Sequence, residues 1–169
     1  MNIIVCGRSG SGKTTAIKRI LAGVQEPIYG FWTEKLAEDP QTGSAPVYIH
    51  GCGEQLRFAP DHQIGSCKNC CAEKHPEVFD DVGVALLRGI PEGSLVLLDE
   101  IGVMEEAAKK FTARLFELLD GNYRVIAAVR DRSTPLLDDI RAHAKSVNVS
   151  AKEANTLEFV AHAREILRL

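Results

Sequence analysis

Apolar residues occur along this chain in two alternating patterns: short unbroken runs, and stripes with helical spacing. The unbroken runs define strands over residues 2–6, 94–100 and 123–130. A run of this kind is typical of a parallel strand that helices cover on both faces, because neither side of the strand meets water. The β-branched and aromatic residues of 27–35 favour another strand, and residues 146–149 a last short one.

Helical stripes follow these strands, with apolar residues three or four positions apart. They predict helices over residues 14–21, 76–88, 105–119, 135–143 and 152–167. In the last helix, the residues expected to face inward are Leu157, Val160, Ile166 and Leu167. The alternation of strands and helices predicts an α/β fold, with a mostly parallel sheet and helices on both of its faces.

The segment 36–75 interrupts this alternation. Short strand candidates at 46–50 and 54–58 flank a glycine turn, which predicts an antiparallel hairpin added to the main sheet. Residues 61–75 are polar and rich in cysteine, and they are expected to form a loop. We treat 36–75 as an insertion within one domain that spans residues 1–169.

Composition narrows the class of protein. The chain has 169 residues, of which 45 % are hydrophobic and 25 % are charged, as in an ordinary globular protein. Its net charge of −3 offers no electrostatic case for nucleic acid or a membrane surface. No apolar run approaches the roughly 18 residues that span a bilayer, and the chain starts directly with a strand. We therefore expect a cytoplasmic protein whose five cysteines are thiols or metal ligands.

A phosphate-binding sequence follows the first strand. Residues 7–15 match the Walker A pattern G-x-x-x-x-G-K-[ST] between a strand and a helix. Glycines let successive N–H groups point at phosphate oxygens, and the helix dipole adds positive potential. Lys13 would reach the β- and γ-phosphates, and the Thr14 hydroxyl would bind Mg²⁺. The candidate phosphate-binding residues are Gly7, Arg8, Ser9, Gly10, Ser11, Gly12, Lys13, Thr14 and Thr15. The alternative is a flexible turn with a chance lysine, and for Arg8 alone a solvated loop residue is the better interpretation.

A second motif ends the strand at 94–100, where four apolar residues lead into Asp99 and Glu100. Asp99 would hold Mg²⁺ beside Thr14, and Glu100 would orient or deprotonate a water molecule near the γ-phosphate. Glu100 could instead be a surface acid. Arg130 ends the next strand on the same rim, where it would stabilise γ-phosphate charge unless it is an ordinary surface arginine. Thr33 and Glu34 either supply polar groups at this rim or merely end their strand in water.

Three stretches together resemble the small P-loop nucleoside-triphosphatases. They are 7–14, the run Gly-Phe-Trp-Thr-Glu at 30–34, and Leu-Asp-Glu-Ile-Gly-x-Met-Glu at 98–105. The resemblance implies a RecA-like core and slow, Mg²⁺-dependent hydrolysis of ATP, GTP and other triphosphates to the diphosphate. It assigns phosphate binding to Gly10, Gly12, Lys13, Thr14 and Thr15, and the metal and water-activating roles to Asp99 and Glu100. One departure is Val103, where the family usually has lysine.

The cysteine-rich segment is a second departure from the family. Cys67-x-x-Cys70 has the spacing of a metal knuckle, and three histidines lie nearby. A zinc site made of Cys52, Cys67, Cys70 and Cys71 would order a loop that is poor in apolar residues. Free thiols and a redox pair remain the alternatives.

Three functions fit these motifs. The first is a Mg²⁺-dependent nucleoside-triphosphate phosphatase with catalytic Lys13, Glu100 and Arg130. A GTPase-type Asn-Lys-x-Asp run is missing from the sequence, which predicts a broad base preference. The second is a P-loop kinase acting on a nucleotide or small molecule, which usually needs an arginine-rich lid; residues 130–143 offer only three arginines. The third is a nucleotide-dependent switch that a partner reads through 36–75.

Overall fold

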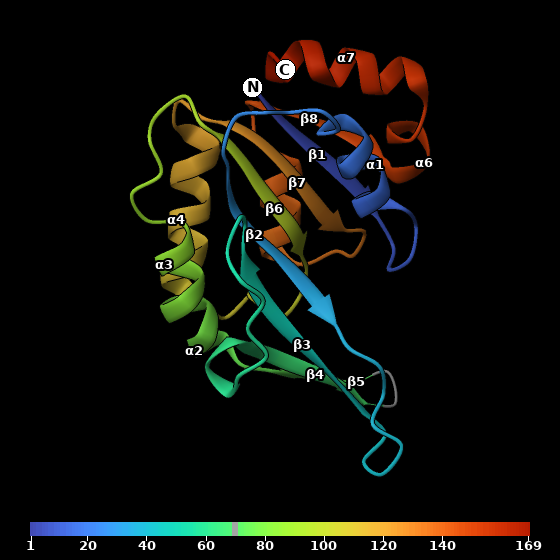
Figure 1. Cartoon of the computed structure of the whole chain (residues 1–169), viewed down its shortest axis with the longest axis vertical. Coiled ribbons are helices and arrows are strands. Elements are labelled where there is room, and N and C mark those ends of the chain that lie inside the picture. The colour runs from blue at the N-terminus through green and yellow to red at the C-terminus, as the bar shows by residue number, and fades with distance from the viewer. Residues whose placement is uncertain (69–70) are drawn as a thin grey trace.

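The computed structural model describes residues 1–68 and 71–169, and the strands of these residues form one twisted sheet (Figure 1). Across the sheet, the order is β5-β4-β3-β2-β6-β7-β1-β8. The strands are β1 Asn2–Gly7, β2 Ile28–Lys35, β3 Ser44–Gly51, β4 Gln63–Lys68, β5 Cys71–Lys74, β6 Leu95–Ile101, β7 Arg124–Arg130 and β8 Ser146–Ser150.

The sheet consists of a parallel half and an antiparallel extension. β2, β6, β7, β1 and β8 pair in parallel, whereas β3, β4 and β5 continue the sheet from β2 in antiparallel pairs. The predicted mostly parallel sheet is therefore confirmed. Ile3, Ile4 and Val5 of β1 are all fully buried, as the unbroken apolar run requires.

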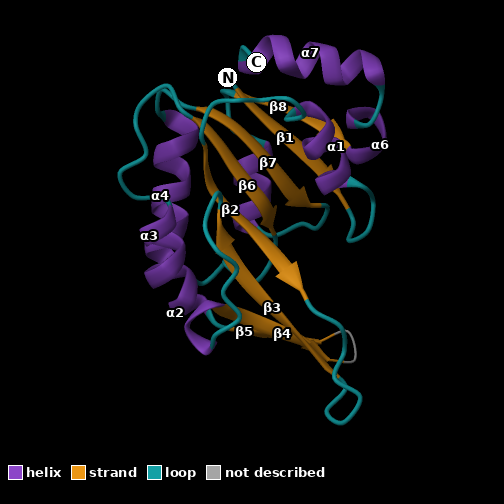
Figure 2. Cartoon of the chain, viewed as in Figure 1, coloured by secondary structure: helices purple, strands orange, loops and turns teal. Residues whose placement is uncertain are grey.

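Helices cover both faces of the parallel half (Figure 2). α1, α6 and α7 pack on one face; α4, α5 and the segment α2–η2–α3 pack on the other. On the second face the rings of Phe31 and Phe79 lie 5.6 and 5.0 Å from that of Phe111. The helices are α1 Lys13–Ile20, α2 Pro76–Val78, α3 Val84–Leu86, α4 Lys109–Asp120, α5 Pro135–Arg141, α6 Ala151–Ala154 and α7 Leu157–Leu167, with the 3₁₀ turn η1 Pro60–His62 and the π-helical turn η2 Phe79–Gly83.

The predicted hairpin is only half right. Its first strand is β3, but residues 54–58 form a loop instead of a strand. Phe58 lies in this loop, and its ring packs on Tyr48 and His50 of β3. The partner of β3 is β4, inside the segment predicted to be a polar loop. β4 forms because its backbone pairs with β3 and β5. Its few apolar side chains do not give the alternating pattern that predicts a strand.

Two predicted helices also differ from the structure. The helix expected over 76–88 is interrupted by a π-helical turn that contains the buried Gly83. A Cβ atom at Gly83 would lie 2.8 Å from the Phe111 ring, so the position has no room for a side chain. The helix expected over 152–167 is two helices, because Thr156 caps a new start by accepting a hydrogen bond from Phe159 N–H. Leu157, predicted to face inward, is 88 % exposed at the first turn of α7.

In the described part of the chain, none of the helices has the length and apolar character needed to cross a membrane.

Candidate active site

The loop between β1 and α1 has the backbone that a phosphate-binding loop needs. It occupies residues 8–12. Gly10 and Gly12 have φ values of +73° and +91°, which residues with a side chain rarely adopt. A Cβ atom at Gly7 would lie only 2.3 Å from Ser11 Oγ. The pattern of glycines is therefore a backbone requirement of this turn, which ends where the N–H groups of α1 begin.

Asn155 supports this loop from the opposite side, and sequence reasoning missed it. Its Nδ2 donates to the carbonyl oxygens of Gly12 at 3.1 Å and of Ala151 at 2.7 Å. The prediction of one continuous helix through 152–167 hid the turn that places Asn155 next to the loop. A single asparagine within a helical pattern offered no signal for this contact.

Lys13 lies across the loop and is almost fully buried. Its Nζ donates to the carbonyl oxygens of Gly7 at 2.9 Å and Arg8 at 2.8 Å. The same ammonium is 2.9 Å from Glu100 Oε2, and the Lys13 side chain is 3 % exposed. A buried cation is thus fixed between the loop and the end of β6, where it would face an anion held by the loop.

Thr14 and Asp99 meet as expected for a pair of magnesium ligands. Thr14 Oγ1 donates to Asp99 Oδ1 at 3.2 Å, although 85 positions separate the two residues. Burial raises the pKa of Asp99, and the hydrogen bond from Thr14 acts in the opposite direction. A hydroxyl and a carboxylate are oxygen ligands that suit Mg²⁺, and a cation there would offset the burial of Asp99.

Glu100 lies between two cations. Its Oε2 contacts Lys13, and its Oε1 accepts from Arg130 Nε at 2.8 Å. Its backbone N–H donates to Thr33 Oγ1 at 3.3 Å, so the end of β2 also reaches the site. The ends of β1, β2, β6 and β7 thereby meet at one edge of the sheet, as parallel strands require. Arg130 and Thr33 both belong to the cluster.

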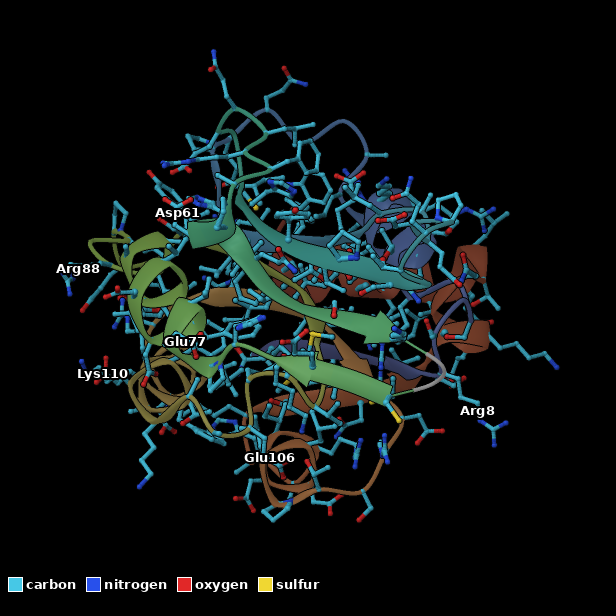
Figure 3. The ribbon with its side chains drawn as sticks, turned by 90° about the horizontal axis from the view of Figure 1, so that it is seen from below. Arg8, Asp61, Glu77, Arg88, Glu106 and Lys110 are labelled. Atoms are coloured by element: carbon cyan, nitrogen blue, oxygen red, sulfur yellow. The ribbon has the colours of Figure 1, made fainter. Side chains whose placement is uncertain are left out.

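The remaining loop residues do not all point into this cluster. Arg8 is exposed and extends away from the sheet (Figure 3), and Ser11 and Thr15 are also exposed. Ser9 lines a cavity of about 170 Å³, together with Thr14, Asp99, Glu100 and Arg130.

Glu34 points to the extension instead of the active-site cluster. Its Oε2 lies 3.6 Å from Nε2 of His50 on β3. Neither atom has a hydrogen-bond partner among the described residues. Burial lowers the pKa of His50, which favours a neutral ring. Glu34 therefore joins the packing of β3, and Thr33 alone reaches the site.

Glu105 is a buried acid beneath the site. Only 1 % of it is exposed, and its Oε1 accepts from the Gly102 N–H at 2.6 Å. Burial raises the pKa of Glu105 to about 7, and the nearby charge of Glu100 acts in the same direction. Sequence reasoning placed Glu105 at the start of a helix, but α4 begins only at Lys109. Glu105 therefore closes the turn after β6, and the helical pattern gave no sign of this role.

The structure does not bring the described candidate zinc ligands, Cys52, Cys67 and Cys71, together at one site. Cys67 on β4 lies opposite Ala45 at the start of β3, whereas Cys52 follows the end of β3. Seven residues of strand correspond to roughly 20 Å, so Cys52 cannot share a metal with Cys67. Cys71 is exposed on β5, and Cys70 lies outside the described residues. Among the described residues, no cluster of three or more Cys, His, Asp or Glu side chains could hold a metal.

Val103 packs largely into the core. It is 8 % exposed and belongs to the apolar cluster on the α4 face of the sheet.

Comparison with known proteins agrees with this fold. A family model described as "NTPase" matches residues 2–161. The chain is 28 % identical over 160 residues to "Nucleoside-triphosphatase THEP1" from Thermotoga sp. (strain RQ2), covering 92 % of this chain and 88 % of the relative. It is 30 % identical over 144 residues to the protein of the same name from Pyrococcus abyssi, covering 80 % of each. The crystal structure of THEP1 from Aquifex aeolicus superimposes with a TM-score of 0.75 over the whole of both chains, at 24 % identity.

Proposed function

This chain belongs to the NTPase family, and we propose that it is a Mg²⁺-dependent phosphatase that converts nucleoside triphosphates to diphosphates and phosphate. As a family member it is a nucleoside-triphosphatase, an enzyme of the hydrolase class. The observation that carries the proposal is the convergence of two contact sets at adjacent residues of β6: Thr14 hydrogen-bonds to Asp99, and Lys13 and Arg130 both contact Glu100.

The triphosphate would bind with its β-phosphate in the loop and its γ-phosphate toward Glu100. Main-chain N–H groups of residues 8–12 and the first turn of α1 would hold the β-phosphate oxygens. The Lys13 ammonium would exchange its loop carbonyl partners for β- and γ-phosphate oxygens, which carry full charge. Binding would therefore weaken the contact of Lys13 with Glu100.

Thr14 and Asp99 would hold the metal through one hydroxyl and one carboxylate oxygen. When bound, Mg²⁺ supplies positive charge to the β- and γ-phosphate oxygens. Because Asp99 is 7 % exposed, its carboxylate is costly to ionise without such a partner.

Glu100 would orient the attacking water and accept its proton. Its contacts with Lys13 and Arg130 would put the carboxylate beside the γ-phosphate. Arg130 holds Glu100 through Nε and would present the rest of its guanidinium to the γ-phosphate, where charge develops during cleavage. The oxygen–phosphorus bond from water forms as the bond to the β–γ bridging oxygen breaks.

We expect the enzyme to accept several bases. The contacts that support catalysis all involve phosphate-facing groups of the loop, β6 and β7, and none requires a particular base. Hydrolysis of ATP and GTP at rates within about tenfold of each other would fit this, since tenfold corresponds to only about 1.4 kcal/mol of discrimination.

The test is phosphate release from ATP, GTP, CTP and UTP, each with Mg²⁺ and with EDTA in its place. We expect the diphosphate and one equivalent of phosphate from every triphosphate with Mg²⁺, and no release with EDTA. Formation of monophosphate and pyrophosphate would refute cleavage at the β–γ bond, and equal rates with EDTA would refute the metal role.

A further inference from the structure

A groove adjoins the candidate active site on its outer side. Its volume is about 1020 Å³, against about 170 Å³ for the cavity that contains Asp99 and Glu100. Ser9, Lys35, Cys67 and Arg130 line both hollows, so the two adjoin each other. An attacking water molecule needs only about 30 Å³, whereas pockets for small molecules span about 300–1000 Å³. The groove is therefore much larger than hydrolysis alone requires.

The charged side chains that line the groove are mostly basic. Among the described residues, four basic side chains line it, namely those of Lys35, Lys74, Arg130 and Arg132, against two acids, Glu38 and Glu106. Arg130 is paired with Glu100. Across the described residues, Lys35, Lys74 and Arg132 form no ion pair, whereas Arg57, Arg114, Arg124 and Arg141 each contact a carboxylate. Three unpaired cations around one hollow suit a small anion.

The groove also lies on the side from which a nucleophile would attack. Phosphoryl transfer needs the attacking and leaving oxygens roughly in line. With the β-phosphate in the loop, the attacking oxygen must approach from beyond the γ-phosphate, next to Glu100 and Arg130. Arg130 separates that position from the groove, and it lines both hollows. A molecule in the groove could therefore present an oxygen where water attacks.

We propose that the groove binds a small phosphomonoester with a free hydroxyl, and that this molecule accepts the γ-phosphoryl group in competition with water. The phosphate of the acceptor would lie among Lys35, Lys74 and Arg132. The proposal rests on the proposed function for the position of the triphosphate, and it adds a second substrate and a second product.

The transfer step balances without any further reactant. The acceptor hydroxyl oxygen forms a bond to the γ-phosphorus, and the bond from that phosphorus to the β–γ bridging oxygen breaks. The bonding electron pair leaves with the nucleoside diphosphate. The hydroxyl proton passes to the Glu100 carboxylate, which later releases it to solvent. The products are the diphosphate and a doubly phosphorylated acceptor.

The experiment follows the label from ATP that carries ³²P in its γ-phosphate. The protein is incubated with Mg²⁺ and the labelled ATP, alone and with AMP, ribose 5-phosphate or glucose 6-phosphate. Adenosine, ribose and glucose serve as neutral counterparts. We expect label in at least one phosphomonoester, and transfer to its neutral counterpart at least about tenfold lower. The three acceptors distinguish a nucleotide from a sugar phosphate.

Two variants locate the acceptor. The double variant K74E/R132E reverses charge at two residues that line the groove and do not line the cavity of Asp99 and Glu100. We expect it to lower transfer at least about tenfold and to keep phosphate release to water within about twofold. The matched control R88E/K110E makes the same changes on side chains far from Arg8 (Figure 3) and should alter neither activity.

The possible results distinguish failure of the acceptor proposal from failure of the proposed function. Label found only in inorganic phosphate with all three acceptors would overturn the acceptor proposal and leave the proposed hydrolase intact. The same holds if K74E/R132E transfers as well as the natural protein. Absence of hydrolysis and transfer together would instead overturn the proposed function.

Discussion

The parallel half of the sheet and its antiparallel extension are built on different principles. In the parallel half, helices cover both faces and strands such as β1 and β6 are buried along most of their length. In the extension, β5 is exposed at every one of its four residues, and β3 alternates between half-buried and buried positions from Ser44 to Ile49. The two parts share β2, which pairs with β6 on one side and β3 on the other.

The parallel half holds the catalytic cluster, whereas the extension forms part of the groove wall. Parallel strands bring their carboxyl ends to one edge, so Lys13, Asp99, Glu100 and Arg130 meet there with little freedom. The extension contributes Cys67 and Lys74 to the walls of the groove, next to Lys35 at the end of β2. We therefore expect substitutions in the parallel half to affect turnover and stability strongly, and substitutions in the extension to have small effects on both.

The largest expected effect is that of Lys13→Ala. The substitution removes a buried cation that faces the β- and γ-phosphates, and an interaction of about 4 kcal/mol in a partly polar site corresponds to roughly 10³-fold in rate. Phosphate release from ATP, measured at saturating Mg²⁺, should fall by at least that factor. Arg8→Ala is the neighbouring control, since Arg8 is exposed, and it should lose far less. Full activity of Lys13→Ala would mean that the loop is not the phosphate site.

Substitution of one phenylalanine in each part tests how much the parallel half and the extension contribute to stability. Phe111 is fully buried against Phe31 and Phe79, so Phe111→Ala should lower the free energy of unfolding by about 3–5 kcal/mol. Phe58 lies on the extension and is 47 % exposed, so Phe58→Ala should cost less than about 1 kcal/mol. Urea denaturation of both variants measures the contrast. Similar losses would show that the extension is as important to stability as the core.

The difference between the parallel half and the extension also explains how much of the fold could be predicted from the sequence. In the parallel half, burial on both faces leaves an unbroken apolar run, and β1, β6 and β7 were predicted within one or two residues. The Walker motifs also placed Thr14 beside Asp99 across 85 positions, because the fold class brings those strand ends together.

In the extension, backbone pairing determines the strands, and the pattern of apolar and polar side chains does not reveal it. β4 contains Gly65 at a φ of +157° and only one large buried apolar residue, Ile64, and it owes its form to pairing with β3. The contacts of Asn155 and Glu105 are invisible for a related reason, since both depend on where a helix begins. A local pattern cannot report either one, because the partner atom is a backbone group elsewhere in the fold.

A smaller effect than that of Lys13 is expected for Glu100→Gln. General-base catalysis contributes about 10²-fold or more, so kcat should fall by at least roughly 10²-fold. Nucleotide affinity should be retained, since the loop and Lys13 remain in place. Titration of a fluorescent nucleotide analogue, together with phosphate release, separates the two quantities. If affinity and kcat fell by the same factor, Glu100 would be a structural group or a metal ligand instead of the base.

The smallest expected effect concerns Glu105 and the pH dependence of stability. Because burial raises its pKa from 4.5 to about 7, the folded protein binds more protons than the unfolded chain between these values. Unfolding free energy from this group must therefore fall as pH rises through the window, by about 1.5 kcal/mol between pH 5.5 and 7. Glu105→Gln resembles the protonated acid and can still accept from Gly102 N–H, so it should lose this part of the pH dependence. Denaturation at the two pH values should show a smaller decrease for Glu105→Gln than for the natural protein, whereas Glu106→Gln, at an exposed neighbour, should match the natural protein. An unchanged decrease in Glu105→Gln would mean that Glu105 is ionised in the folded protein, and that the turn after β6 tolerates a buried charge beside Glu100.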